Sequence, residues 1–123
     1  MSETIALKSL HLEYRIWIAE LNFDINLIRI FNDRLLELAA LPKSDRGAFE
    51  KKFNESRATI DELRHKMHIE KMNLAAITRD KNNFAHYETK IPDNYKSIRG
   101  DFFRFRVYFN ELKSEFLRFE NNK

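Results

Sequence analysis

Three acidic residues stand among apolar residues at helical spacing, and they have the clearest capacity for chemistry in this sequence. Glu13, Glu20 and Asp24 follow one another at intervals of seven and four residues, which places them on one face of an α-helix. Trp17 and several aliphatic residues share this face. Because a buried carboxylate without a partner is costly, each acid needs either a metal ion or a hydrogen-bonding or cationic side chain.

A metal site is one way to satisfy these acids. Bundles with carboxylate-bridged metals use two Glu-x-x-His motifs on facing helices. This sequence has one such motif, Glu62-x-x-His65, followed by His68. Both histidines project away from the first helix when the second is drawn as a wheel, so this is the weaker alternative and no cofactor is expected. The alternative metal set consists of Glu13, Glu20, Asp24, His65 and His68.

A buried polar layer is the interpretation that the spacing favours. In an antiparallel pair of helices whose facing residue numbers sum to about 87, Lys71 reaches Glu13 or Glu20, and Arg64 reaches Asp24. The indole N–H of Trp17 donates to Glu70 in the same register. Such a layer fixes the helix register, and Asp24→Asn or Glu20→Gln would lower stability. The layer comprises Glu13, Trp17, Glu20, Asp24, Arg64, Glu70 and Lys71.

Three long helices are the elements that would position these residues. Apolar residues recur at alternating intervals of three and four, which predicts helices over about residues 3–40, 45–80 and 93–121. Asp93 after Pro92 is the preferred start of the third helix, with Asp101 as the alternative. The two Gly and two Pro residues leave little turn chemistry for strands. We therefore predict a single all-α domain over 1–123, an up-down-up bundle with 79–92 as a connecting loop.

Composition narrows the functional classes. The 123 residues fit one domain, and 43% hydrophobic with 33% charged residues is neither a disordered nor a membrane composition. The N-terminus lacks the apolar core of a signal peptide, so we expect a cytoplasmic protein without a membrane segment. With no cysteine and no glycine-rich phosphate loop, an enzyme is not expected.

An apolar overhang is predicted at the turn near Pro42. In the expected register the third helix reaches only the level of Phe31, which leaves the tip of the first two helices uncovered. We therefore expect a homodimer, with an unknown protein partner as the alternative. The predicted partner surface is Leu35, Leu36, Leu38, Leu41, Phe49 and Phe53.

The first helix also carries a second apolar stripe, about 120° from its main seam on the helical wheel. Two stripes predict two neighbouring helices. The second stripe is Ile5, Leu12, Ile16, Phe23, Leu27 and Ile30.

Nucleic-acid binding is a weaker alternative. The net charge is only +3, with a pI of about 9.2. Basic and aromatic residues gather over 79–106, but acidic residues are interleaved and most of the aromatic residues are needed in the core. His86 in the connecting loop could bind a ligand, although loop packing is the simpler explanation.

Five short motifs, distributed over most of the chain, together resemble the pattern of a known protein family. They are His11-x-Glu13-x-x-x-Trp17-x-x-Glu20-Leu21-x-Phe23, Phe31-x-x-Arg34-Leu35-x-Glu37, Ile60-Asp61-Glu62-Leu63-Arg64-His65, His86-Tyr87-Glu88 and Leu112-Lys113-x-Glu115-Phe116-x-Arg118-Phe119. This pattern resembles a family of short, uncharacterised bacterial helical proteins. The resemblance implies a bacterial cytoplasmic setting and, since that family has no assigned activity, no catalytic residues. The sequence as a whole predicts a non-enzymatic structural or protein-interaction bundle, with a metal- or small-ligand-binding bundle that uses the acids of the first helix as the alternative.

Overall fold

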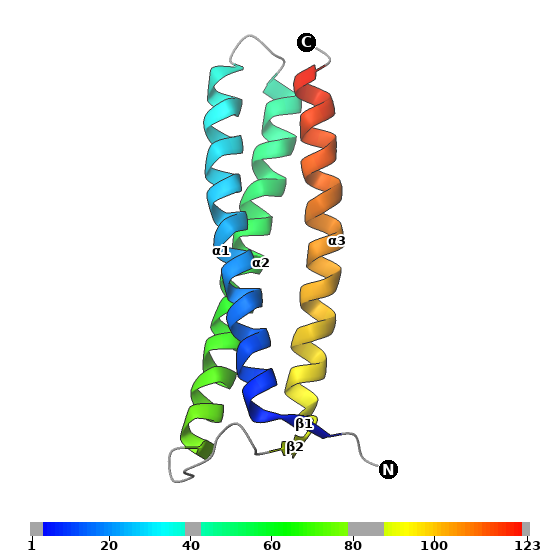
Figure 1. Cartoon of the computed structure of the whole chain (residues 1–123). Helices are drawn as coiled ribbons and strands as arrows, with labels where there is room; N and C mark the ends of the chain where they lie inside the picture. The colour runs from blue at the N-terminus through cyan, green and yellow to red at the C-terminus, as the bar shows by residue number, and fades with distance from the viewer. Residues whose placement is uncertain (1–3, 39–42, 79–87, 122–123) are drawn as a thin grey trace.

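The computed structural model is a bundle of three long helices with two short strands at one end (Figure 1). It describes residues 4–38, 43–78 and 88–121. The helices are α1 (Leu7–Glu37), α2 (Lys43–Thr78) and α3 (Asp93–Asn121). The predicted all-α up-down-up bundle is confirmed, and the third helix begins at Asp93 rather than at Asp101. Of the predicted 79–92 loop, residues 79–87 lie outside the described ranges.

Two strands at the lower end of Figure 1 correct the prediction for the N-terminus. β1 (Thr4–Ala6) pairs antiparallel with β2 (Glu88–Lys90), with Thr4 opposite Lys90. The first helix therefore starts at Leu7 and not near residue 3, because Ala6 keeps an extended backbone at φ −66° and ψ 135°. The ladder lies just before α1 and just before α3, so it holds the starts of these two parallel helices together.

The core follows the predicted seams. The α1 seam is buried from Leu10 to Leu35, with Leu10 and Leu21 fully enclosed. On α3 the corresponding row runs from Tyr95 to Phe116. Helices form here because each has a continuous apolar face to bury, which contributes more stability than intrinsic propensity does.

The predicted overhang is wrong, because α3 covers the tip of the α1–α2 pair. The ring of Phe116 lies 5.0 Å from Phe31 and 5.3 Å from Phe53, and Phe119 lies 4.9 Å from Phe49. Figure 1 shows the C-terminal end of α3 beside this tip. Leu35, Leu38 and Phe53 are buried and Phe49 is partly buried, whereas Leu36 is 75% exposed and Leu41 lies outside the described ranges.

The reason is the register of α3. The hydrogen bonds from Arg106 to Glu20 and from Arg34 to Glu120 each join residues 86 apart. α3 therefore ends level with Leu35, about one helical turn beyond the predicted level of Phe31.

Candidate functional site

The acids of α1 face α3, not α2. Both nitrogens of the Arg106 fork donate to Glu20, with Nε–Oε2 at 2.9 Å and Nη2–Oε1 at 3.0 Å. The Arg106 guanidinium also lies 4.6 Å from the centre of the Phe102 ring. The predicted contact of Lys71 with Glu20 is therefore wrong. A bidentate arginine pair fixes orientation, so this contact sets the relative level of α1 and α3.

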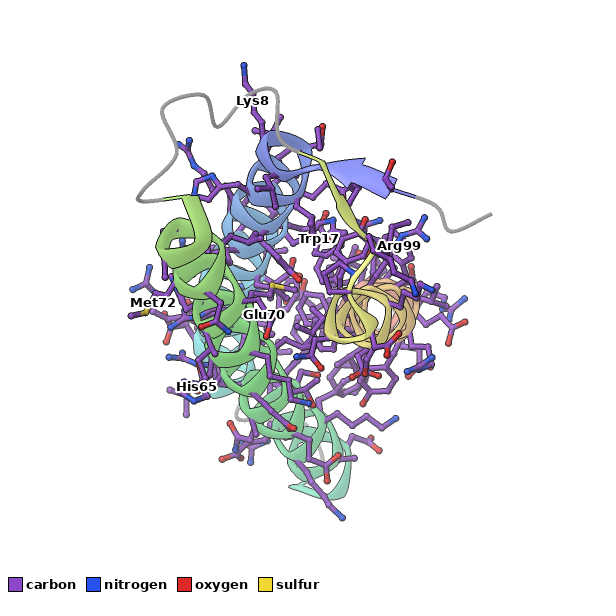
Figure 2. All side chains as sticks on the ribbon, turned by 90° about the horizontal axis from the view of Figure 1, so that it is seen from below. Lys8, Trp17, His65, Glu70, Met72 and Arg99 are labelled. Carbon is purple, nitrogen blue, oxygen red and sulfur yellow. The ribbon has the colours of Figure 1, made fainter. Side chains whose placement is uncertain are left out.

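Glu13 and Trp17 also find their partners on α3. The Tyr95 hydroxyl donates to Glu13 Oε2. Burial, and then this hydrogen bond, raise the pKa of Tyr95 to about 12, so the phenol stays protonated at neutral pH. Trp17 points from α1 toward α3 (Figure 2) and stacks on Tyr95 and Phe102, with ring centres 5.8 and 5.3 Å apart.

Two of the side chains of α2 that were predicted to complete the layer, Arg64 and Glu70, have other partners. Arg64 donates to Asn22 Oδ1 at 2.9 Å rather than to Asp24. Glu70 accepts a hydrogen bond from Asn94 Nδ2 at 3.2 Å rather than from the Trp17 indole. The pKa of His11 is lowered by burial and then by the charge of Lys71. Of the predicted layer, the structure thus keeps the α1 members together and separates the α2 members from them.

Asp24 is a buried acid, with only 6% of its surface exposed, to which the described residues provide no hydrogen bond or ion pair. It lies on the wall of a cavity of about 280 Å³ between α1 and α3. Burial raises its pKa to about 6, Glu20 adds to this effect, and Lys113 and Arg106 oppose it. The cavity is lined by Glu20, Phe23, Asp24, Arg106, Phe109, Asn110 and Lys113.

The chemistry available at this cavity is proton uptake. Its two acids and two bases balance in charge, so the cavity favours no ligand of one charge sign. A carboxyl group with a pKa near 6 changes its protonation near neutral pH, which links bundle stability to pH.

The structure does not bring together the five residues of the alternative metal site. His65 and His68 are exposed, and Figure 2 shows His65 on the outer face of α2, away from α1 and α3. Glu13 and Glu20 are engaged by α3 instead. Within residues 4–38, 43–78 and 88–121, no group of three His, Asp or Glu residues could hold a metal ion.

The basic 79–106 end is only partly described. Among its described residues, Arg99 and Arg106 each lie 5.1 Å from the centre of the Phe103 ring. Arg104 donates to Asp101. Arg99 and Arg106 are therefore engaged with the ring of Phe103. His86, the possible ligand-binding residue of the loop, lies outside the described ranges.

A row of exposed apolar side chains is the most extended surface feature of α1. Leu12, Ile16, Phe23 and Ile30 are 51%, 54%, 60% and 53% exposed, and Leu27 is partly buried between them. These five residues, which we call the α1 stripe, belong to the stripe that was predicted to face a second neighbouring helix. In a single chain the stripe instead faces solvent along most of its length.

A second exposed row lies on α3. It consists of Phe103, Val107 and Leu117, which are 36%, 59% and 51% exposed, and we call it the α3 row. Phe103 contacts Trp17 of α1 at a ring distance of 6.2 Å. Phe23 of the α1 stripe and Asn110, which follows Val107 by three residues, line the same cavity. The two rows therefore flank one side of the bundle, with the α1–α3 polar contacts between them.

The functional residues that the sequence reasoning missed are on α3. Tyr95, Arg106 and Lys113 supply what Lys71 and Arg64 were expected to supply. A signal was present, because Arg99, Arg106 and Lys113 recur at intervals of seven beside the phenylalanine seam. A basic row at that spacing predicts an acidic row on the neighbouring helix.

The Glu20–Arg106 contact can be tested by Glu20→Gln. We expect the free energy of unfolding to fall by about 1 kcal/mol, because a half-exposed bidentate pair is partly screened by solvent. Urea unfolding followed by circular dichroism measures this. Glu55→Gln is the control, since its pair with Lys51 is exposed and 4.0 Å long, and its change should stay within about 0.5 kcal/mol. Equal changes in the two variants would contradict a special role for Glu20.

Comparisons with protein-family models, with curated proteins and with solved structures gave no match. The resemblance to a bacterial helical family, and the cytoplasmic setting that it implies, stay predictions. No helix in the described part of the chain combines the length and the apolar character needed to cross a membrane.

Proposed function

We propose that this chain is a non-enzymatic structural and protein-interaction bundle that self-associates through the α1 stripe and the adjoining α3 row. The observation that carries this proposal is the exposure of seven large apolar side chains, each between 36% and 60% exposed, along two adjacent rows. Single exposed apolar residues are normal on a soluble protein, but contiguous rows of this length are typical of interaction sites.

The size of the surface supports a second copy as the partner. With about half of each side chain exposed, the seven side chains present roughly 700 Å² of surface, close to the ~800 Å² per molecule of a standard interface. The stripe from Leu12 to Ile30 extends for about 27 Å at the rise of an α-helix. A helix of similar length would cover it, and another copy of α1 provides one.

The polar contacts between α1 and α3 have a structural role in this proposal. Glu13, Glu20 and Arg34 of α1 are held by Tyr95, Arg106 and Glu120 of α3. Three such contacts, spread along the length of the two helices, make α1 and α3 one rigid platform. A rigid platform favours association, because less side-chain freedom is lost on binding.

Leu12→Glu tests the proposal. We expect the wild type to sediment as a dimer at about 50 µM and Leu12→Glu as a folded monomer, because a charge buried in an apolar interface costs several kcal/mol. Leu36→Glu is the matched control, since Leu36 is 75% exposed but lies off the stripe. It should remain dimeric.

Two outcomes would overturn the proposal. The first is a wild type that stays monomeric at that concentration. The second is dissociation of the Leu36→Glu variant to the same extent as Leu12→Glu, which would place the interface at the tip of the bundle. Circular dichroism spectra of both variants establish that each is folded.

A further inference from the structure

The α1 stripe has charged edges of opposite sign. All of its residues except the partly buried Leu27 belong to an exposed heptad pattern in which every position follows the last by three or four residues. On the edge toward α3 stand Glu13, Glu20 and, at the C-terminal end, Arg34, and on the opposite edge stand Lys8, Arg15 and Arg29. The heptad positions are Ser9, Leu12, Ile16, Ala19, Phe23, Asn26, Ile30 and Asp33.

We propose that two copies pair through their α1 helices in parallel and in register, as a two-stranded coiled coil. This inference rests on the proposed function and specifies its geometry. A two-fold axis parallel to the helices brings the acidic edge of each copy against the basic edge of the other. Arg15 then faces Glu20 of the second copy, and Lys8 faces Glu13, each pair being five residues apart in sequence. Antiparallel pairing would join like edges and place Arg15 near Arg29.

The polar heptad position favours the same geometry. In a parallel pair Asn26 meets Asn26 of the second copy, and two amides can satisfy each other's hydrogen bonds. In an antiparallel pair centred between Ala19 and Phe23, Asn26 would instead meet Ile16. Asn26 Oδ1 accepts a hydrogen bond from Arg29 Nη2 at 3.2 Å in the single chain, but an aliphatic side chain offers no acceptor to the amide N–H groups.

The parallel geometry also covers the α3 row. Residues of α1 lie level with α3 residues 86 positions later. In the parallel dimer the basic edge of the second copy runs along α3, with its Arg15 near Phe103 and its Arg29 near Leu117. The ring of Phe103 already contacts Arg99 and Arg106 of its own chain, so these second-copy arginines contribute through their stems, which pack on apolar surface while the guanidinium stays in water.

Disulfide trapping distinguishes the two geometries directly, because the chain has no cysteine of its own. Ser9→Cys and Asp33→Cys replace polar heptad positions near opposite ends of the stripe. We expect each variant, oxidised alone, to form covalent dimers with itself. Thr59→Cys, exposed on α2, is the control and should not form them at the same rate. If the two variants cross-link mainly with each other when mixed, the pairing is antiparallel and this inference is wrong.

Charge reversal gives a second test. Arg15→Glu should weaken the dimer by about tenfold, because it places a carboxylate against Glu20 of the second copy. Arg29→Glu should weaken it less, because the loss of the Arg29 stem near Leu117 is offset by removal of the repulsion between Arg29 and Arg34 of the second copy. Tightening by both variants would indicate antiparallel pairing. A monomeric wild type would overturn the proposed function itself, so the two failures are distinguishable.

Discussion

Replacing Phe116 by alanine is expected to lower the free energy of unfolding by about 4 kcal/mol. Phe116 is fully buried, and its ring lies 5.0 Å from Phe31, 5.3 Å from Phe49 and 5.3 Å from Phe53. These rings come from α1 and α2, so the truncation removes the contact by which α3 closes the tip of the bundle. Large aromatic neighbours refill a cavity poorly, so we expect a loss of stability in the upper part of the range that is usual for Phe→Ala in a protein core.

Urea unfolding at one fixed protein concentration measures this loss, because association shifts the apparent stability. Leu36→Ala is the control at the same end of the bundle, and its change should stay within about 0.5 kcal/mol because Leu36 is largely exposed. A loss below about 1 kcal/mol for Phe116→Ala would mean that α3 does not cover the tip. The overhang expected from sequence would then be correct after all.

The helices and their buried faces could be predicted because each depends on local periodicity. The seam through Leu10, Trp17 and Phe31 repeats at the helical period, and burial follows from that repeat alone. The start of α3 at Asp93 also has a local cause, since Pro92 prevents the helix from extending backward and Asp93 lies in the first turn.

The level of α3 could not be predicted, because it depends on contacts distant in sequence. A shift of one helical turn along α1 would keep the phenylalanine seam buried, so periodicity does not exclude it. The connection over 79–92 is too long to fix the level, unlike the short turn between α1 and α2. In the structure the level follows from the β1–β2 ladder and from the Glu20–Arg106 pair.

The partners of the acids were mispredicted for the same reason. With α3 placed one turn too low, Arg106 lies level with Ile16 instead of Glu20, and the acids were matched only with cations of α2. The α1 stripe was correctly recognised as apolar. Periodicity alone could not tell whether a helix of the same chain or another molecule covers it.

Above pH 7 the Asp24→Asn variant is expected to be more stable than the wild type. An acid held in an ion pair would give the opposite result, a loss of stability. The pKa of Asp24 is about 6 in the folded state against 3.8 for the ordinary carboxyl group, mainly because of burial. Between these values the folded state holds more protons than the unfolded state. Stability conferred by the neutral carboxyl group is therefore fully present below about pH 3.8 and is lost as the pH rises through 6.

The difference between the two pKa values of Asp24 corresponds to at most roughly 3 kcal/mol in the free energy of unfolding. Replacing the carboxylate by an amide also removes its attraction to Lys113 and Arg106, which reduces the stability gained by the substitution. We expect Asp24→Asn to exceed the wild type by about 2 kcal/mol at pH 8 and to match it near pH 4.5. Urea unfolding of both proteins across this range measures the difference, in which the titration of the histidines cancels. Asp61→Asn, an exposed acid on α2, should show no such crossover. A less stable Asp24→Asn variant at pH 8 would mean that the Asp24 carboxylate is held by a net favourable ion pair.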